Sequence, residues 1–357
     1  MNFFLNLIIF LISLFNIWKC KKSNITKATY FIIKDTKELI DSRTTKFTNL
    51  RKQHLTKNIN FVRSVSYRLS FKSILTLKNI IVLNSIFEII SKKNKILNRK
   101  PSETHKEYCK ILEKLFRFSN ISEFKMIDDY RMLPIFLPIL NRLKIDNTGY
   151  MHGRISNDLD YQKNLKIYKF NRYVVWNKYF KKKILELNSK YRNKDVLIRN
   201  PLINYTIKKI SNENGICIVE EDNIKLKTYI KIINQLKNQN KFKIYFKLRP
   251  NNQINKNLIN ILKKNNIETF YKENIFNVLK KYNIKILLAF NSSLLIECSY
   301  YNVIPIMIYD YRPSIKEYLI DEIVFDSKII NLKKKIDNHK KLIKKLKRIK
   351  KKLWNMN

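Results

Sequence analysis

The chain has 357 residues, which is enough for two domains with sizeable cores. Its formal net charge of +45 favours anionic partners. The sequence is also rich in Lys, Ile and Asn and has only three Gly, a composition that A+T-rich codons impose. The charge alone therefore does not choose among a nucleotide, a lipid headgroup and RNA as the partner. The four cysteines are widely spaced, without a CxxC pair or a His cluster, which argues against a zinc site and a disulfide framework and favours a reducing, cytoplasmic interior.

The first apolar stretch, residues 3–18 (FFLNLIIFLISLFNIW), is followed by Lys19, Lys21 and Lys22. As a helix it spans roughly 24 Å, less than the ~30 Å hydrocarbon core of a bilayer. No basic segment precedes it and no small-residue cleavage site follows, so a cleaved signal peptide is not expected. Two interpretations stay open. The stretch is a membrane anchor or interfacial helix, with the lysines on the cytoplasmic side, or it is a buried helix of the first domain.

In the first half of the chain, residues 29–33 (TYFII) predict a strand, whereas residues 60–92 alternate apolar runs with basic residues and predict loop and helix. Residues 123–131 (EFKMIDDYR) predict a strand that ends in the paired carboxylates Asp128 and Asp129, with a helix after it. Residues 172–187 predict a short strand and a helix, and residues 195–199 predict another strand before a turn at Asn200-Pro201.

The second half shows the same alternation more clearly. Residues 215–223 (GICIVEEDN) predict a strand ending at Glu220 and Glu221, and residues 241–251 (KFKIYFKLRPN) predict a strand running into Arg249-Pro250-Asn251. An apolar run at 284–290 breaks at Asn291-Ser292-Ser293, continues with helical spacing, and is followed by a second apolar run at 303–308. Strand, polar corner, helix, strand is typical of a parallel α/β sheet, whose ligands lie at the carboxyl ends of strands.

The pattern therefore predicts an α/β chain with two Rossmann-like domains, at residues 23–205 and 206–330, between an apolar helix (1–22) and a basic amphipathic helix (331–357). Residues 333–352 contain twelve Lys or Arg and one Asp. Such a helix suits an anionic membrane surface, and the alternative is that its narrow apolar stripe packs on its own protein.

Two Rossmann-like halves describe the GT-B architecture of glycosyltransferases, and several short motifs carry a resemblance to one group of them. YMHGRIS (150–156), followed by YVVWNKYFKKKIL and VLIRNP, resembles the N-terminal half of bacterial surface-polysaccharide transferases. KLRPN (247–251) and FNSSLLIE (290–297) are similar to the "HP" and "SS" motifs of bacterial sialyltransferases and capsule transferases. The chain departs from that pattern at Arg249, where the family has a His, and at Tyr130, where its acidic base motif has a Gly.

The resemblance implies an acceptor domain followed by a donor-nucleotide domain, and it implies roles for particular residues. The general base would be Asp129 or His152, with Asp128 beside them. The donor phosphate would be held by the set Arg249, Pro250, Asn251, Ser292 and Ser293. Glu220 or Glu221 would contact the nucleoside and Glu297 a ribose hydroxyl. Each has a plain structural alternative: a helix cap for Asp128 and Asp129, a turn for His152, and a solvated strand end for the paired glutamates.

The expected function is that of a glycosyltransferase building a cell-surface polysaccharide (capsule, O-antigen or lipopolysaccharide) from a nucleotide-sugar donor and a glycan or glycolipid acceptor. No metal is expected, because no DxD stands at a strand end, and no cofactor beyond the donor substrate. The enzyme would lie at the inner face of the cytoplasmic membrane, peripheral or N-terminally anchored.

Two other functions remain open. A nucleic-acid-binding protein would use the charge and the many aromatic residues, but these fall mostly in apolar runs, so nucleic acid is not the expected partner. A catalytically inactive, membrane-associated relative would explain the changes at Arg249 and Tyr130.

Overall fold

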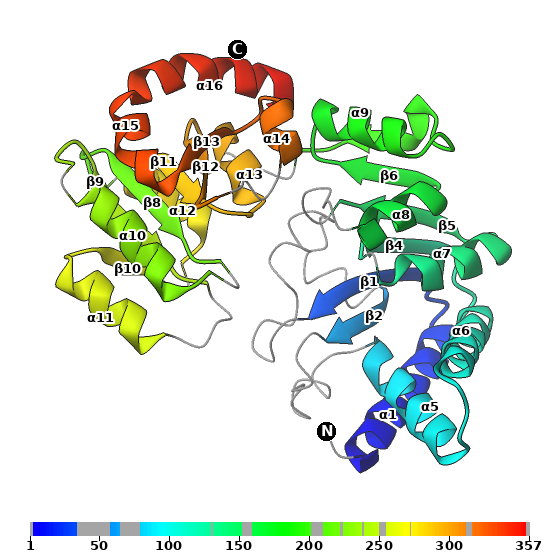
Figure 1. The fold of residues 1–357 in the computed structure, drawn as a ribbon. Coiled ribbons are helices and arrows are strands. Elements are labelled where there is room, and N and C mark those ends of the chain that lie inside the picture. The colour runs from blue at the N-terminus through cyan, green and yellow to red at the C-terminus, as the bar shows by residue number, and fades with distance from the viewer. Residues whose placement is uncertain are drawn as a thin grey trace. The chain divides into compact units, whose positions relative to one another are not determined.

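The structure is a computed structural model that describes residues 3–33, 58–64, 79–129, 131–151, 159–200, 210–221, 224–237, 239–249, 255–271, 273–311 and 316–354. The chain divides into two compact units, Met1–Pro201 and Leu202–Asn357, which we call the N-terminal and C-terminal units (Figure 1). Each unit is built on one parallel sheet with helices packed against it. The prediction of two Rossmann-like domains is therefore confirmed.

The sheet of the N-terminal unit has seven parallel strands in the order β3-β2-β1-β4-β5-β6-β7. The strands are β1 (Lys27–Ile33), β2 (Ile59–Ser64), β3 (Ile80–Val82), β4 (Glu123–Ile127), β5 (Asp146–Tyr150), β6 (Arg172–Val175) and β7 (Val196–Ile198). The strand order reverses between β1 and β4, which makes this pair the topological switch point, where open α/β sheets bind ligands. Strands β2 and β3 lie in residues 60–92, for which the sequence predicted loop and helix. The two strands contradict that prediction, whereas helix α5 (Leu83–Ile96) confirms its helical part.

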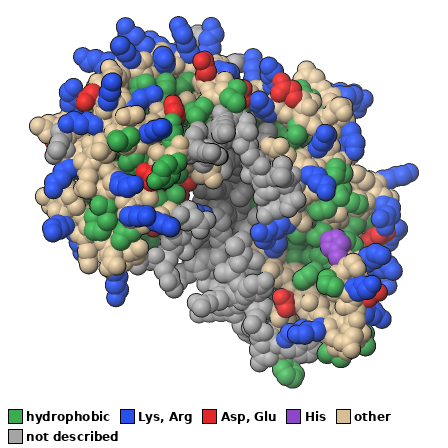
Figure 2. Space-filling view, viewed as in Figure 1, with side chains coloured by type: hydrophobic (Ala, Val, Ile, Leu, Met, Phe, Trp, Pro, Cys, Tyr) green, Lys and Arg blue, Asp and Glu red, His purple; other side chains and the backbone are tan. Residues whose placement is uncertain are grey.

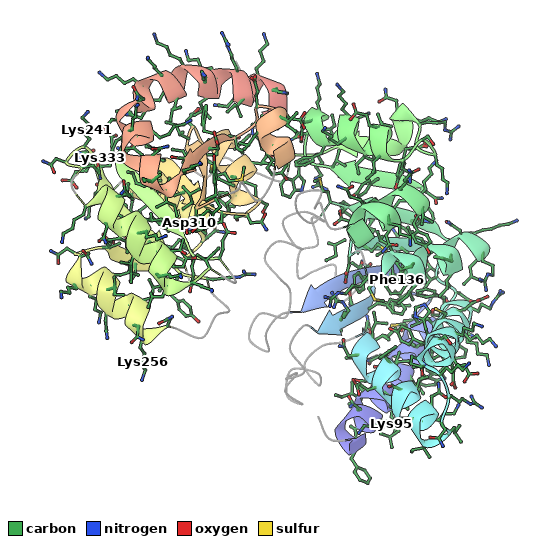
Figure 3. All side chains as sticks on the ribbon, in the orientation of Figure 1. Lys95, Phe136, Lys241, Lys256, Asp310 and Lys333 are labelled. Carbon is green, nitrogen blue, oxygen red and sulfur yellow. The ribbon has the colours of Figure 1, made fainter. Side chains whose placement is uncertain are left out.

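The helices of the N-terminal unit cover the faces of this sheet (Figure 1). They are α1 (Phe3–Lys22), α5 (Leu83–Ile96), α6 (Pro101–Phe118), α7 (Leu133–Arg142), α8 (Leu159–Ile167) and α9 (Lys178–Leu187), with a 3₁₀ turn η1 (Asn193–Asp195). An aromatic cluster joins strand to helix: the ring centroids of Phe61 and Phe116 are 4.9 Å apart and those of Phe124 and Phe136 5.1 Å apart. Phe136 is buried and points into this core (Figure 3). Aromatic rings bury a large apolar area and so contribute strongly to the stability of a core.

The sheet of the C-terminal unit has six parallel strands in the order β10-β9-β8-β11-β12-β13. Its elements are β8 (Gly215–Val219), α10 (Leu226–Leu236), β9 (Lys243–Lys247), α11 (Lys256–Lys264), β10 (Glu268–Phe270), α12 (Ile275–Lys281), β11 (Ile284–Ala289), α13 (Leu294–Tyr300), β12 (Ile304–Tyr309), α14 (Lys316–Ile320), β13 (Phe325–Lys328), η2 (Ile329–Asn331), α15 (Leu332–Asp337) and α16 (His339–Trp354). The switch point lies between β8 and β11. Both strands are buried on both faces apart from the half-buried Lys285 of β11, which is why their sequences are otherwise apolar.

The terminal helices each pack one face on their own unit. In α16 the apolar residues Leu342, Leu346, Ile349 and Leu353 are buried, so the apolar stripe packs against its own unit and lysines cover the outer side. Helix α1 packs on β3 and α5. Within the described part of the chain, no helix combines the length and the apolar character needed to cross a membrane.

Asparagine takes the backbone position at which helices usually end with glycine. In six helices, the residue after the C-cap is an Asn with a positive φ: Asn24, Asn98, Asn120, Asn266, Asn283 and Asn302. Lys144 and Glu322 end two more, and no glycine of the described residues has a positive φ. Glycine is preferred there because it has no Cβ, and Asn is the next best tolerated residue.

On the surface that Figure 2 shows, basic side chains outnumber acidic ones. Lys95, Lys241, Lys256 and Lys333, which come from helices and loops of both units, are exposed and point outward (Figure 3). The large positive charge is therefore carried on solvated faces, as expected for long charged side chains.

Candidate functional site

At the switch point of the N-terminal sheet, the carboxylate of Asp129 is held by two side chains from the neighbouring strands. Asp129 follows β4, Tyr30 lies on β1, and Arg63 lies near the end of β2. The Tyr30 hydroxyl donates to Asp129 Oδ2 at 2.5 Å, and Arg63 donates from Nε at 2.9 Å and approaches with Nη2 at 2.7 Å. The other oxygen, Oδ1, accepts the backbone N–H of Arg131 at 3.2 Å. We call Tyr30, Arg63 and Asp129 the N-terminal triad.

Tyr30 and Asp129 are buried and Arg63 is half-buried. The Asp129 side chain is 3% exposed and that of Arg63 19% exposed. Burial, and after it the neighbouring Asp129 carboxylate, raises the pKa of Tyr30 well above its ordinary value, so this hydroxyl stays protonated and acts as a donor. A carboxylate that accepts hydrogen bonds from a guanidinium and a phenol is fixed in position.

Asp128, the other carboxylate after β4, turns to the opposite side of the switch point. Its Oδ2 accepts the hydroxyl of Tyr173, from β6, at 2.5 Å. Tyr173 is fully buried and stacks between Phe170 and Tyr191, with ring centroids 5.3 Å and 6.0 Å away. The two adjacent carboxylates therefore diverge, with Asp129 tied to β1 and β2 and Asp128 tied to β6.

The C-terminal unit repeats this arrangement with glutamates. Glu220 and Glu221 follow β8 at the switch point, and each carboxylate crosses to a different loop. Glu220 Oε2 accepts the backbone N–H of Arg249, after β9, at 2.7 Å. Glu221 accepts the N–H groups of Phe290 at 2.7 Å and Asn291 at 2.8–2.9 Å, after β11. Two consecutive carboxylates thus fix the two loops on either side of the crevice where ligands of such sheets bind.

The loop after β11 presents hydroxyl and amide groups at that crevice. Ser292 Oγ accepts the N–H of Leu294 at 3.2 Å, and Ser293 Oγ donates to Glu297 Oε1 at 2.8 Å. Glu297 is buried on α13, so its carboxylate is directed to Ser293. Among the described contacts, the backbone N–H groups of Ser292 and Ser293 make no hydrogen bond. Both serines are half-buried, as is Arg249.

The structure thus brings Glu220, Glu221, Arg249, Ser292, Ser293 and Glu297 together at one sheet edge and places Asp128 and Asp129 at the switch point of the other unit. His152, Tyr130, Pro250 and Asn251 lie outside the described residues. The roles assigned to all of these residues stay predictions.

Three supporting residues were missed in the sequence. The buried Lys247 at the end of β9 donates to the carbonyls of Leu248 and Tyr271 at 2.8 and 2.7 Å, and burial lowers its pKa. The Tyr229 hydroxyl accepts the N–H of Glu221 at 2.8 Å. Arg63 forms the ion pair with Asp129. A basic residue that closes an apolar strand run, as in FVRS and YFKLR, is the only sequence signal that two of these gave.

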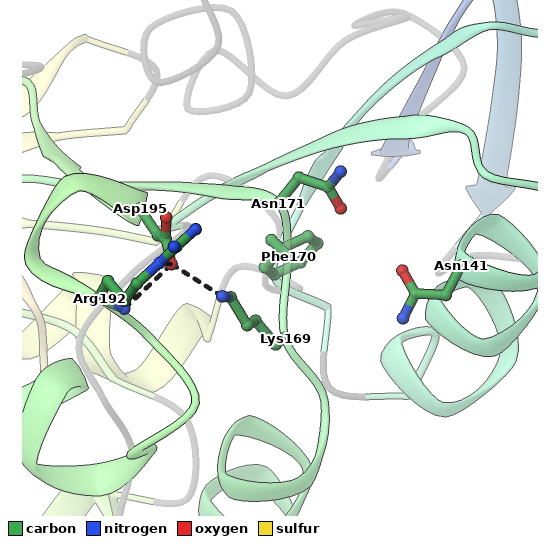
Figure 4. A pocket seen from close by; sticks show the side chains of 6 residues that line it. All are labelled: Asn141, Lys169, Phe170, Asn171, Arg192 and Asp195. Carbon is green, nitrogen blue, oxygen red and sulfur yellow. Dashed lines mark hydrogen bonds and ion pairs between the residues drawn. The ribbon is translucent and has the colours of Figure 1, made fainter.

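A separate cavity of about 330 Å³ lies at the opposite, amino-terminal edge of the N-terminal sheet (Figure 4). Its lining residues precede β6 and β7 or end α7: Asn141, Lys169, Phe170, Asn171, Arg192 and Asp195. Lys169 Nζ donates to Asp195 Oδ2 at 2.8 Å, and this hydrogen bond, with the Arg192 backbone N–H, lowers the pKa of Asp195 to about 2. Lys169 and Arg192 both form ion pairs with Asp195, which indicates a structural role for this edge.

No group of three or more His, Cys, Asp or Glu side chains that could hold a metal ion is found within the part of the chain that the structure describes.

Both units have a Rossmann-type sheet in the strand order 3-2-1-4-5-6, to which the N-terminal unit adds a seventh strand, and together they give the chain the GT-B fold. Solved structures of this architecture resemble it over nearly its whole length. The UDP-GlcNAc 2-epimerase from Neisseria meningitidis bound to UDP-GlcNAc is similar with a TM-score of 0.56 and 13% identity, over 90% of this chain and 94% of that one.

Two glycosyltransferases resemble the chain equally well. CalG4, the calicheamicin glycosyltransferase, gives a TM-score of 0.59 at 7% identity, over 91% of this chain and 93% of that one. The glycosyltransferase of kitacinnamycin gives 0.54 at 8% identity, over 91% and 94%. No family model and no curated protein matches the sequence. At these identities the likeness establishes the fold.

Proposed function

We propose that the protein is a glycosyltransferase that takes a sugar from a nucleotide-sugar donor held by its C-terminal unit. The observation that carries the proposal is the grouping of Arg249, Ser292 and Ser293 at the carboxyl edge of β8, β9 and β11, on loops that Glu220 and Glu221 hold in place. A guanidinium and hydroxyl groups suit the oxygens of a diphosphate. The UDP-GlcNAc 2-epimerase of similar fold is bound to UDP-GlcNAc, and CalG4 is a glycosyltransferase, and both support this assignment.

The reaction needs two kinds of group. The acceptor hydroxyl oxygen forms a bond to the anomeric carbon, the bond from that carbon to the diphosphate oxygen breaks, and the nucleotide leaves with the electron pair. A general base takes the proton of the acceptor hydroxyl, and we assign this role to Asp129 or His152. Arg249 and the two serines stabilise the charge that develops on the leaving diphosphate. The triad orients Asp129 through Arg63 and Tyr30, so these two are positioning residues.

In this proposal the acceptor is a glycan or glycolipid and the product a cell-surface polysaccharide, such as a capsule, an O-antigen or lipopolysaccharide. The support is the resemblance of the motifs at 150–156, 247–251 and 290–297 to bacterial surface-polysaccharide transferases. The same motifs connect the chain with sialyltransferases and capsule transferases, so a CMP-linked or UDP-linked donor is the first to test.

The experiment is a thermal-shift and calorimetric titration of the full chain with CMP, CDP, UDP and GDP. One nucleotide should stabilise the protein, and Arg249→Ala should weaken its binding about 10- to 100-fold, because a charge-assisted hydrogen bond to phosphate contributes about 1.5–3 kcal/mol. Ser292→Ala with Ser293→Ala should also weaken it. Arg99→Ala and Ser122→Ala, at exposed positions of the N-terminal unit, are the matched controls.

Turnover then separates the enzyme classes. Nucleotide release that requires an added acceptor supports a transferase, whereas an epimerised sugar nucleotide without acceptor would assign the protein to the epimerases of the same fold. Stabilisation by an RNA oligonucleotide alone, abolished by salt, would support the nucleic-acid alternative. Silence towards every nucleotide would contradict the proposal.

A further inference from the structure

Helix α1 carries polar side chains on the face that packs against the protein. Asn6 and Ser13 are buried together with Ile9, Ile17 and Cys20. The Ser13 hydroxyl accepts the N–H of Val82, at the end of β3, at 3.2 Å and donates to the carbonyl of Ile9 at 2.8 Å. These contacts attach α1 to the sheet edge along one side and fix which side faces outward.

The other side of α1 is apolar and exposed. Phe4 is 70% exposed, Leu11 55%, Phe15 59% and Trp18 50%. Because successive helical residues are rotated by about 100°, positions 4, 8, 11, 15 and 18 fall on one face. We call this set, with Leu14 at its margin, the α1 outer face: Phe4, Ile8, Leu11, Leu14, Phe15 and Trp18. A contiguous apolar surface of this kind marks an interaction site, whereas single exposed apolar residues do not.

Lysines border this face at the carboxyl end of the helix. Lys19, Lys21 and Lys22 are exposed, and α1 contains no Asp or Glu. Lys22 Nζ lies 5.5 Å from the Trp18 ring centroid, and Lys21 Nζ lies 4.3 Å from that of Phe118, an exposed residue at the end of α6. Aromatic rings next to ammonium groups are the side chains that favour the boundary between lipid headgroups and acyl chains.

We propose that the α1 outer face docks on an anionic lipid bilayer, with the helix lying in the plane of the surface. The apolar side chains would enter the acyl boundary by about 5–10 Å, and the lysines would remain at the level of the lipid phosphates. Charge selects this occupant. A second copy of the chain would bring two sets of lysines and two net charges of +45 together, whereas an anionic lipid surface neutralises them.

The test is flotation of the full-length protein with vesicles of phosphatidylcholine alone and of phosphatidylcholine mixed with phosphatidylglycerol. The protein should float with the anionic vesicles, and less in high salt. Lys19→Gln, Lys21→Gln and Lys22→Gln together should weaken binding roughly 100-fold, since each lysine near an anionic surface contributes about a fivefold factor. Phe15→Ser with Trp18→Ser should weaken it about tenfold or more. Ile320→Ser with Ile330→Ser, at exposed positions of the C-terminal unit, is the matched control and should float normally.

Quenching of Trp18 reports the geometry. Vesicles with brominated acyl chains should quench part of the protein fluorescence, and Trp18→Phe should remove that quenched part while the protein still floats. Equal binding to neutral and anionic vesicles, or unchanged flotation of the Phe15/Trp18 variant, would overturn the proposal. A dimer that forms without lipid and is lost in the Phe15/Trp18 variant would also overturn the proposal, because the α1 outer face would then bind a second copy of the chain. Nucleotide binding is measured on residues of the C-terminal unit, so neither result depends on the proposed transferase activity.

Discussion

Replacing Arg63 by Met should destabilise the N-terminal unit by about 2–3 kcal/mol. Removing one partner of a buried ion pair typically costs about 3–5 kcal/mol, because the other charge is left in a poorly solvated place. Here the Asp129 side chain is 3% exposed, but it keeps the hydrogen bonds from the Tyr30 hydroxyl and the Arg131 N–H, which lowers the cost. Asp129→Asn retains an acceptor oxygen and should cost about 2 kcal/mol.

The double variant decides whether these effects share one cause. If the pair is coupled, Arg63→Met with Asp129→Asn should cost about 2 kcal/mol less than the sum of the two single changes, because no uncompensated charge remains. Urea unfolding is the assay, since guanidinium would screen the pair. Of the three Trp, only the buried Trp176 remains as reporter in a Trp18→Phe, Trp354→Phe background.

The exposed pair Lys182–Glu186, at 3.7 Å on α9, is the control cycle, and its coupling should stay below about 0.5 kcal/mol. Additivity of the Arg63 and Asp129 changes to within that margin would refute the reasoning. The same variants should leave nucleotide binding by the C-terminal unit unchanged, because the triad belongs to the other unit.

Three further predictions follow from single contacts. Glu221→Gln should destabilise the C-terminal unit by about 2 kcal/mol, because the amide keeps only one acceptor oxygen for the N–H groups of Phe290 and Asn291; urea unfolding checks this, and the exposed Glu213→Gln should change little. The ionised Asp195, whose pKa is lowered to about 2, contributes stability that is complete above about pH 4 and lost as the pH falls through about 2; Asp195→Asn should flatten acid unfolding in this window, and an unchanged profile would contradict the assignment. Gly149→Ala should cost roughly 1–3 kcal/mol or more, because the new Cβ would lie 2.3 Å from the Phe170 ring; Phe170→Leu should recover part of the thermal unfolding temperature of that variant.

The sequence predicted those elements in which the pattern of apolar and polar side chains follows their burial directly. Strand β8 (GICIV) is buried on both faces and has an unbroken apolar sequence, and β11 (IKILLA) is apolar except for the half-buried Lys285. The acidic pairs after β4 and β8 and the polar corner after β11 could be placed at strand ends because each directly follows an apolar run. Their presence at switch points follows from the strand order, which confirms the predicted fold.

The remainder depends on contacts between residues far apart in the chain. Strand β2 ends with Arg63, which looks like a solvent-facing residue until its partner Asp129, 66 positions later, is placed beside it. Strand β5 (DNTGY) has no apolar run. Its Asn147 is buried because the amide donates to the side chain of Asn171 at 2.8 Å and its oxygen accepts the Asn171 N–H at 3.0 Å. The direction in which each carboxylate of a pair turns was equally invisible in the sequence.

The asparagines that end the helices have a consequence for how this protein could be engineered. A left-handed backbone costs an L-residue free energy that glycine does not lose, on the order of 0.5 kcal/mol for Asn. Positions such as Asn24, Asn98, Asn120 and Asn266 lie on surface turns away from both switch points. Glycine at several of them should raise thermostability in small, additive steps. Because the chain uses so little glycine, substitutions at these turns can raise its thermal stability without changing the core or the candidate site.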